Sequence, residues 1–151
     1  MAVDNAFASG QTLAVFAAIG REDQILLRYD NGRHALPGGP VQGQQPIESS
    51  LRKMLLDQLG ISPPHLSFYV AVECVANAGE TLAYRVAMVF DASVTKADLH
   101  GPGPSLPHRW IGIDELASVD LYPHEAQRAL SPRWLATESP WLPAPAATRP
   151  Q

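Results

Sequence analysis

A glycine-rich loop and the segment that follows it carry the residues with the clearest chemical potential. Gly38 and Gly39 lie shortly before a predicted helix, where backbone N–H groups can meet a phosphate. At about 100° per residue, Met54, Asp57 and Gln58 fall together on one face of that helix. A carboxylate on such a face can hold a divalent cation that bridges protein and phosphate. Loop and helix together indicate a phosphate site, with Asp57 as its one charged metal ligand.

The segment that must position these residues is predicted to be an amphipathic helix. Pro46 suits its first position, where the missing N–H is not needed, and Gly60 suits its C-terminal cap. Apolar residues recur every four positions and form a stripe on one face: Ile47, Leu51, Leu55 and Leu59. Met54 lies beside this stripe and can simply widen the core. The sequence therefore predicts a loop followed by a helix that ends at Gly60, and the apolar stripe is the face of that helix expected to be buried.

The spacing of this stretch resembles the signature of the Nudix family. That signature is Gly, five residues, Glu, seven residues, then Arg-Glu-apolar-x-Glu-Glu-x-Gly-apolar. Laid on this chain without a gap, it begins at Gly39 and ends at Gly60 and Ile61. The likeness extends to His108–Ile111 and Asp114–Leu116, and it covers residues 11–136. It implies an α/β (α+β) fold, a Nudix-like αβα sandwich with a central mixed β-sheet.

The charged positions of the signature differ in this chain. In the family the glutamates of this box bind Mg²⁺ or Mn²⁺, and the arginine orients one of them. Here Gln45, Met54, Asp57 and Gln58 stand at the glutamate positions, and Lys53 stands at the arginine. A thioether is a poor partner for a hard cation, which prefers oxygen. The resemblance therefore implies a degenerate box, in which the candidate catalytic residues are Gln45, Lys53, Asp57 and Gln58, and Asp57 is the weak metal ligand.

Residues around the glycine loop are candidates for ligand binding. The loop amides of Gly38 and Gly39, together with Lys53 and Arg33, could hold a nucleotide phosphate. In many Nudix relatives a tryptophan beside the ligand stands where this chain has His34. The imidazole could therefore contact phosphate or base, or it could be a half-buried strand histidine.

Two charged residues interrupt apolar runs further along the chain. Glu73 lies within Leu66–Ala76 and Arg85 within Thr81–Asp91, which are predicted to form a β-hairpin. The two side chains could pair across the sheet, face solvent, or grip a ligand in a pocket, since a buried charge needs a partner. The candidate ligand-binding residues are thus Arg33, His34, Gly38, Gly39, Glu73 and Arg85.

Length and composition bound the class of protein. A chain of 151 residues with 46% hydrophobic content suits one globular domain. Its net charge of −4 argues against a nucleic-acid partner, and no apolar run approaches the ~20 residues that cross a bilayer. The single cysteine, Cys74, excludes an internal disulfide, and the N-terminus lacks the basic region of a signal peptide. We expect a cytoplasmic protein without nucleic-acid or membrane partners.

The order of elements suggests one domain with short flanks. Residues 1–10 are expected to be a flexible leader, residues 11–137 the Nudix-like domain, and the Pro/Ala-rich residues 138–151 a disordered tail. Thr12–Ile19 and Gln24–Tyr29 read as a hairpin, and His108–Ile113 as the last strand. Asp114 is expected to cap a short helix, and Tyr122–Leu135 to form a C-terminal helix.

The first of three functions consistent with the sequence is a hydrolase-deficient Nudix domain. It would bind a nucleotide or another phosphate-bearing small molecule, and no cofactor is expected. Catalysis at a diphosphate needs charge neutralisation by a metal and a positioned water, which the box no longer offers. A second copy of the chain is a further partner that the resemblance implies, since relatives often dimerise.

The second function is an active Nudix hydrolase that cleaves a nucleoside diphosphate linked to another group. It would need Mg²⁺ or Mn²⁺ in a rearranged site, made by Asp57, the carbonyls of Gln45 and Gln58, and a carboxylate outside the box. Glu48 is the nearest spare carboxylate, but helix geometry turns it about 120° away from Asp57.

The third function drops phosphate chemistry. The scaffold could serve a metal-independent enzyme or a protein-interaction module. An acid–base enzyme would need a titratable pair in the pocket, for which the candidates are His34, Glu73 and His108.

Overall fold

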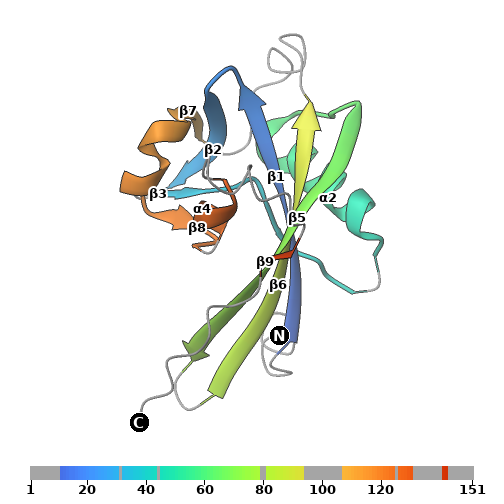
Figure 1. Ribbon diagram of the computed structural model, residues 1–151. Helices are drawn as coiled ribbons and strands as arrows, with labels where there is room; N and C mark the ends of the chain where they lie inside the picture. Colours follow the sequence, from blue (N-terminus) through green and yellow to red (C-terminus); the bar gives the residue numbers. More distant parts are fainter. Residues whose placement is uncertain are drawn as a thin grey trace.

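The computed structural model describes residues 11–30, 32–43, 45–78, 81–93, 107–124, 126–130 and 141–142 (Figure 1). The expected leader and most of the expected tail lie outside these residues. The elements in chain order are β1 (Gln11–Arg21), β2 (Gln24–Asp30), β3 (Arg33–Ala35), β4 (Gly38–Pro40), α2 (Ile47–Leu59), β5 (His65–Ala78), β6 (Thr81–Ser93), β7 (His108–Gly112), the 3₁₀ helix η1 (Ile113–Ser118), β8 (Leu121–Tyr122), α4 (Ala126–Ala129) and β9 (Trp141–Leu142).

Strand β1 joins two halves of a mixed, curled sheet. Its length pairs in parallel with β6, from Gln11 opposite Tyr84 to Ile19 opposite Ala92, and its middle pairs antiparallel with β4. Strands β5 and β9 extend that half, while β2, β3, β7 and β8 form the other. The expected hairpin of β1 with β2 exists only at its turn, where Gly20 and Arg21 pair with β2.

The alternation of side chains along β1 explains its central position. Ala14, Phe16 and Ala18 belong to a core cluster between the two halves of the sheet. Val15, Ala17 and Ile19 belong to a second cluster, which α2 covers with its apolar stripe. A strand that is apolar on both faces must be covered on both faces. Figure 1 shows this arrangement, with α2 on one side of β1, β5 and β6, and the smaller strands on the other. The mixed sheet with its covering helix confirms the predicted fold class.

Helix α2 spans the predicted residues, with a small shift at its start. Pro46 is the N-cap, with φ −60° and ψ 142°, rather than the first helical residue as predicted. An extended ψ places a residue just outside the helix, and such boundaries commonly shift by one. Gly60 caps the C-terminus at φ 68°, and its N–H donates to the carbonyl of Leu56 at 3.0 Å. This left-handed turn favours glycine and confirms the predicted stop.

The C-terminal part differs from the prediction in three ways. Asp114 lies in the first turn of η1 rather than at its cap, which is Gly112. The predicted helix from Tyr122 is wrong at its start, because Tyr122 belongs to β8 and the residue before a proline avoids the helical region. In the described residues this helix is reduced to α4, and residues 131–135 lie outside them.

Two residues of the expected tail lie in the described part of the chain. Trp141 and Leu142 form β9, which pairs in parallel with Ala71 and Val72 of β5. These two apolar residues interrupt the Pro/Ala-rich composition on which the expectation of disorder rested. None of the helices in the described part of the chain is long and apolar enough to cross a membrane.

Candidate functional site

Two adjoining cavities bring together most of the residues singled out in the sequence. The first, of about 430 Å³, lies between β4 and α2, and the second, of about 320 Å³, lies along β3, β4 and β8. They share Arg28, Gly38, Gly39 and Pro40. The first also includes Gln45, Lys53, Met54, Asp57 and Gln58, and the second also includes Phe16, Arg33, His34 and Tyr122.

Gly38, which lines both cavities, occupies a position that only glycine can fill. The Gly38 φ is +134°, and a Cβ atom there would lie 2.1 Å from the carbonyl oxygen of Val15. Strand β4 therefore approaches β1 so closely that only glycine fits. The Pro37 carbonyl also accepts a hydrogen bond from the Ala17 N–H at 2.9 Å. These contacts fix the loop before α2 against the sheet.

Gln58 binds the backbone of Gly38 through both polar atoms of its side-chain amide. The Gly38 N–H donates to Gln58 Oε1 at 3.0 Å, and Gln58 Nε2 donates to the Gly38 carbonyl at 2.9 Å. A glutamate could accept the first bond but could not donate the second, and its charge would face a carbonyl oxygen. The geometry therefore explains why a neutral amide stands at this position of the box.

Gln45 and Met54 also have structural contacts. Gln45 Oε1 accepts a hydrogen bond from Ser50 Oγ at 3.2 Å, at the start of α2. Met54 is half-buried and packs against the core cluster beneath α2. It therefore widens the core, as one reading of the sequence suggested.

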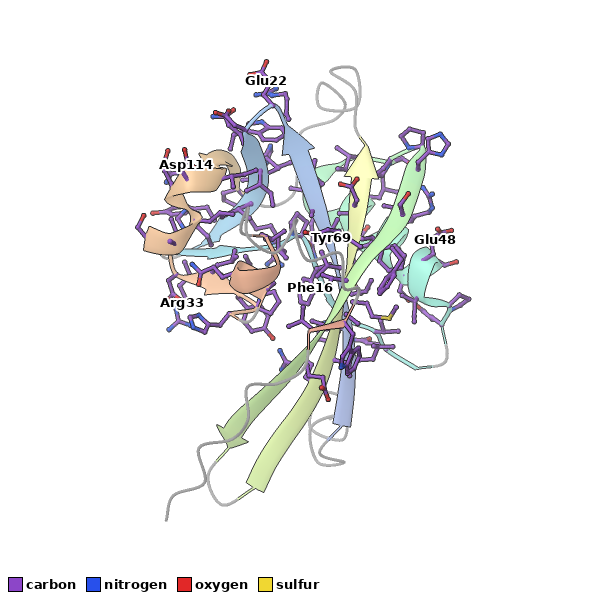
Figure 2. The ribbon with its side chains drawn as sticks, in the orientation of Figure 1. Phe16, Glu22, Arg33, Glu48, Tyr69 and Asp114 are labelled. Atoms are coloured by element: carbon purple, nitrogen blue, oxygen red, sulfur yellow. The ribbon has the colours of Figure 1, made fainter. Side chains whose placement is uncertain are left out.

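The charged side chains of the first cavity are Arg28, Lys53 and Asp57. Lys53 and Asp57 are both exposed. Glu48, the spare carboxylate, does not line this cavity; it lies on α2 and forms an ion pair with Arg52 at 4.0 Å (Figure 2). The first cavity thus holds two cations and one carboxylate.

The donor set does not fit a divalent metal. Mg²⁺ and Mn²⁺ favour several oxygen ligands with carboxylates among them. In the described ranges no three His, Cys, Asp or Glu residues come together to hold a metal ion. The Gly38 carbonyl already accepts from Gln58 Nε2, and Arg28 Nη1 lies 3.5 Å from the same oxygen. A cation at this carbonyl would meet a guanidinium, so the set suits an anion better.

His34 is the buried polar residue of the second cavity. It is 8% exposed, and both of its ring nitrogens are buried without a hydrogen-bond partner among the described residues. Burial lowers the pKa of His34 below 6.5, the positive charge of Arg109 lowers it further, and Asp120 acts in the opposite direction. The ring is therefore neutral near pH 7, and its two nitrogens are closed off from solvent.

An aromatic pair and an exposed arginine complete the second cavity. The rings of Phe16 and Tyr122 meet edge to face, with centroids 6.1 Å apart. Arg33 is exposed at the margin of β3 and pairs with Asp120 at 3.7 Å (Figure 2). The second cavity therefore offers an apolar wall beside polar groups, which suits the organic part of a small ligand.

Neither Glu73 nor Arg85 lines either of the two cavities. Their Cα atoms are not directly opposite each other, because Glu73 faces Val86 and Arg85 faces Cys74 in the β5–β6 register. The Arg85 guanidinium lies 5.5 Å from the centre of the Tyr122 ring, so Arg85 borders the aromatic wall without lining either cavity.

Sequence reasoning missed Arg28, which lines both cavities. The available signal was one positive charge in the apolar strand Gln24–Asp30. The pairing of β2 with β3 and β7 directs this side chain toward the loop, and the pairing with β7 is not local in sequence.

Comparisons with known proteins identify the fold. No protein-family model matches the chain, and no curated protein matches it in sequence. Among solved structures, a MutT Nudix hydrolase from Burkholderia pseudomallei is 24% identical, with 69% of this chain and 84% of that chain covered and a TM-score of 0.57. A MutT protein from Methanosarcina mazei Go1 is 19% identical, with coverage of 85% and 96% and a TM-score of 0.63. A UDP-X diphosphatase is 15% identical, with coverage of 87% and 66% and a TM-score of 0.62. The predicted Nudix fold is thereby confirmed.

Proposed function

We propose that this Nudix-fold protein binds a nucleotide or another phosphate-bearing small molecule and hydrolyses it poorly or not at all. The observation that carries the proposal is the Gln58 amide, whose two polar atoms are both engaged with the Gly38 peptide. At the point where the family has a metal-binding glutamate, this chain has a structural contact.

The charge balance of the first cavity supports an anionic ligand. Arg28 and Lys53 contribute two positive charges against the one negative charge of Asp57. The phosphates of the ligand would lie here, beside the glycine loop and the start of α2. Their negative charge would then face a site of net positive charge without a metal.

The shape of the second cavity supports an organic group on the ligand. Phe16 and Tyr122 offer an aromatic wall, and the neutral ring of His34 belongs to the same lining. Each cavity is comparable in size to small-molecule sites of about 300–1,000 Å³. The two together suit a ligand with a phosphate end and a ring.

Poor hydrolysis follows from the same residues. Cleaving a phosphoanhydride requires stabilisation of developing negative charge and an activated water. Amides at positions 45 and 58 keep the shape of a carboxylate but not its charge. A ligand in these cavities would therefore be held rather than turned over.

The test is ligand-dependent thermal stabilisation measured in EDTA. The panel contains ADP, ATP, UDP-glucose and inorganic pyrophosphate, each at several concentrations. We expect at least one nucleotide to raise the melting temperature in a saturable manner. No shift with any panel member, in EDTA or with Mg²⁺ or Mn²⁺ added, would contradict the proposed function.

A further inference from the structure

Arg28 lies at the junction of the two cavities. Its backbone pairs with Ala35 of β3 on one side and with His108 of β7 on the other. Its half-buried side chain reaches the glycine loop, where Nη1 lies 3.5 Å from the Gly38 carbonyl oxygen. Pairing on both strand edges fixes the Arg28 backbone, so its side chain extends toward the loop from a defined position.

The guanidinium has unused hydrogen-bonding capacity. Its Nε atom is buried and has no hydrogen-bond partner among the described residues. Arg28 takes part in neither the Arg33–Asp120 nor the Arg52–Glu48 ion pair. A buried donor without a partner is costly, and a buried charge without a counter-charge is more so. Nε itself is closed off from solvent, so an anionic oxygen of a ligand would reach the guanidinium through its terminal nitrogens, from the cavities that Arg28 lines.

We propose that the Arg28 guanidinium takes the place of the divalent cation in this site and binds phosphate oxygens of the ligand directly. This inference rests on the proposed function. It names the group that supplies the positive charge. The planar guanidinium matches phosphate oxygens with two parallel N–H bonds, which an ammonium cannot reproduce.

The neighbours of Arg28 support this role over a purely structural one. The Gly38 carbonyl already accepts a shorter hydrogen bond from Gln58 Nε2, at 2.9 Å, so the long contact from Arg28 is not needed to hold the loop. The other cations of the cavities are exposed: Lys53 extends from α2, and Arg33 is paired with Asp120. Arg28 is thus the half-buried cation common to both cavities.

The experiment measures the dissociation constant of inorganic pyrophosphate by titration calorimetry in EDTA. Wild type is compared with Arg28→Gln, Arg28→Lys and Arg21→Gln. Arg21 is the matched control, because it is also a strand arginine but is exposed and stacks on Trp110 at 4.2 Å, away from both cavities. The melting temperature of each free protein verifies that it is folded.

We expect wild type to bind pyrophosphate without metal and Arg28→Gln to bind about 10- to 100-fold more weakly, since charge-assisted hydrogen bonds are lost. Arg28→Lys should recover part of the affinity, and Arg21→Gln should match wild type within about twofold. In wild type, pyrophosphate should also shift the Arg28 Nε–H resonance in a ¹H–¹⁵N spectrum. A merely structural arginine would not give this shift.

The outcomes separate this inference from the proposed function. If nucleotides of the panel bind but Arg28→Gln binds pyrophosphate as tightly as wild type, Arg28 does not replace the metal while the proposed function stands. Binding of pyrophosphate that requires Mg²⁺ leads to the same conclusion. If neither nucleotides nor pyrophosphate bind under any condition, the proposed function itself fails.

Discussion

The amide of Gln58 and the peptide of Gly38 exchange two hydrogen bonds, one in each direction, at 3.0 and 2.9 Å. They join the last turns of α2 to the loop that precedes it, twenty residues earlier in the chain. This pairing requires one donor and one acceptor on the same side chain, and glutamine provides both. A position expected to serve catalysis therefore serves to hold the loop.

Replacing Gln58 with glutamate should destabilise the protein. The carboxylate loses the bond to the Gly38 carbonyl and repels it, so we expect a loss of about 1–3 kcal/mol in the free energy of unfolding. Gln45→Glu is the matched control, because Gln45 Oε1 only accepts a bond, from Ser50 Oγ, and a carboxylate can do the same. Urea denaturation at pH 7.5 compares the three proteins. Equal stability of Gln58→Glu and wild type would contradict the role of this pairing.

Gly38→Ala should be more damaging than an alanine at another left-handed glycine. A Cβ at Gly38 would lie 2.1 Å from the Val15 carbonyl oxygen, whereas one at Gly32, with φ +79°, would meet nothing within 4 Å. We expect a loss of about 3 kcal/mol or more for Gly38→Ala, and about 1–2 kcal/mol for Gly32→Ala. Thermal unfolding measures both losses. Similar losses for the two variants would show that β4 does not approach β1 so closely.

His34 should make stability depend on pH. Because burial, followed by the charge of Arg109, lowers its pKa in the folded protein, the unfolded chain binds a proton more readily. The contribution of neutral His34 is complete above pH 6.5 and is lost as the pH falls below that value. Between pH 7.5 and 5.5, the free energy of unfolding should therefore fall more for wild type than for His34→Asn. The exposed His65 provides the matched substitution, and the pH dependence of His34→Asn is compared with that of wild type and of His65→Asn. A His34→Asn protein with that same dependence would contradict the assignment.

Tyr122→Ala should separate the two ends of the ligand site. Loss of the aromatic wall beside Phe16 should weaken nucleotide binding by about 3- to 10-fold, and pyrophosphate binding should stay unchanged. Phe68→Ala removes a similar aromatic edge contact, with Phe90, outside both cavities, and should change neither affinity. Calorimetry with ADP and pyrophosphate gives both values. A parallel loss of affinity for the two ligands in Tyr122→Ala would contradict the division of the site.

The fold was predictable where the signals were local. The four-residue period of Ile47 to Leu59 and the glycine at position 60 determine α2 and its end within the sequence itself. Strand β1 was predicted as a strand, but its parallel pairing with β6 was not, because a contact between residues 73 positions apart leaves no local pattern.

The location of the candidate site was predictable from the sequence, but the roles of its individual residues were not. The glycine loop and the box positions do line one cavity, since the spacing of the signature places them there. The pairing of Gln58 with Gly38 was missed, because a glutamine at a glutamate position reads as a missing charge rather than a new contact. Arg28 was missed because only the register of β2 with β3 and β7 aims it at the loop.

The central claim is that this scaffold holds a phosphate-bearing ligand without hydrolysing it. The most direct measurement is product release at high protein concentration, on nucleoside diphosphate conjugates and triphosphates, with Mg²⁺ and Mn²⁺ tested separately. Asp57→Ala is the control, since Asp57 is the one carboxylate of the first cavity among the described residues. We predict that wild type releases no more product than Asp57→Ala. Turnover in wild type that vanishes in Asp57→Ala would demonstrate a working metal site and contradict the claim.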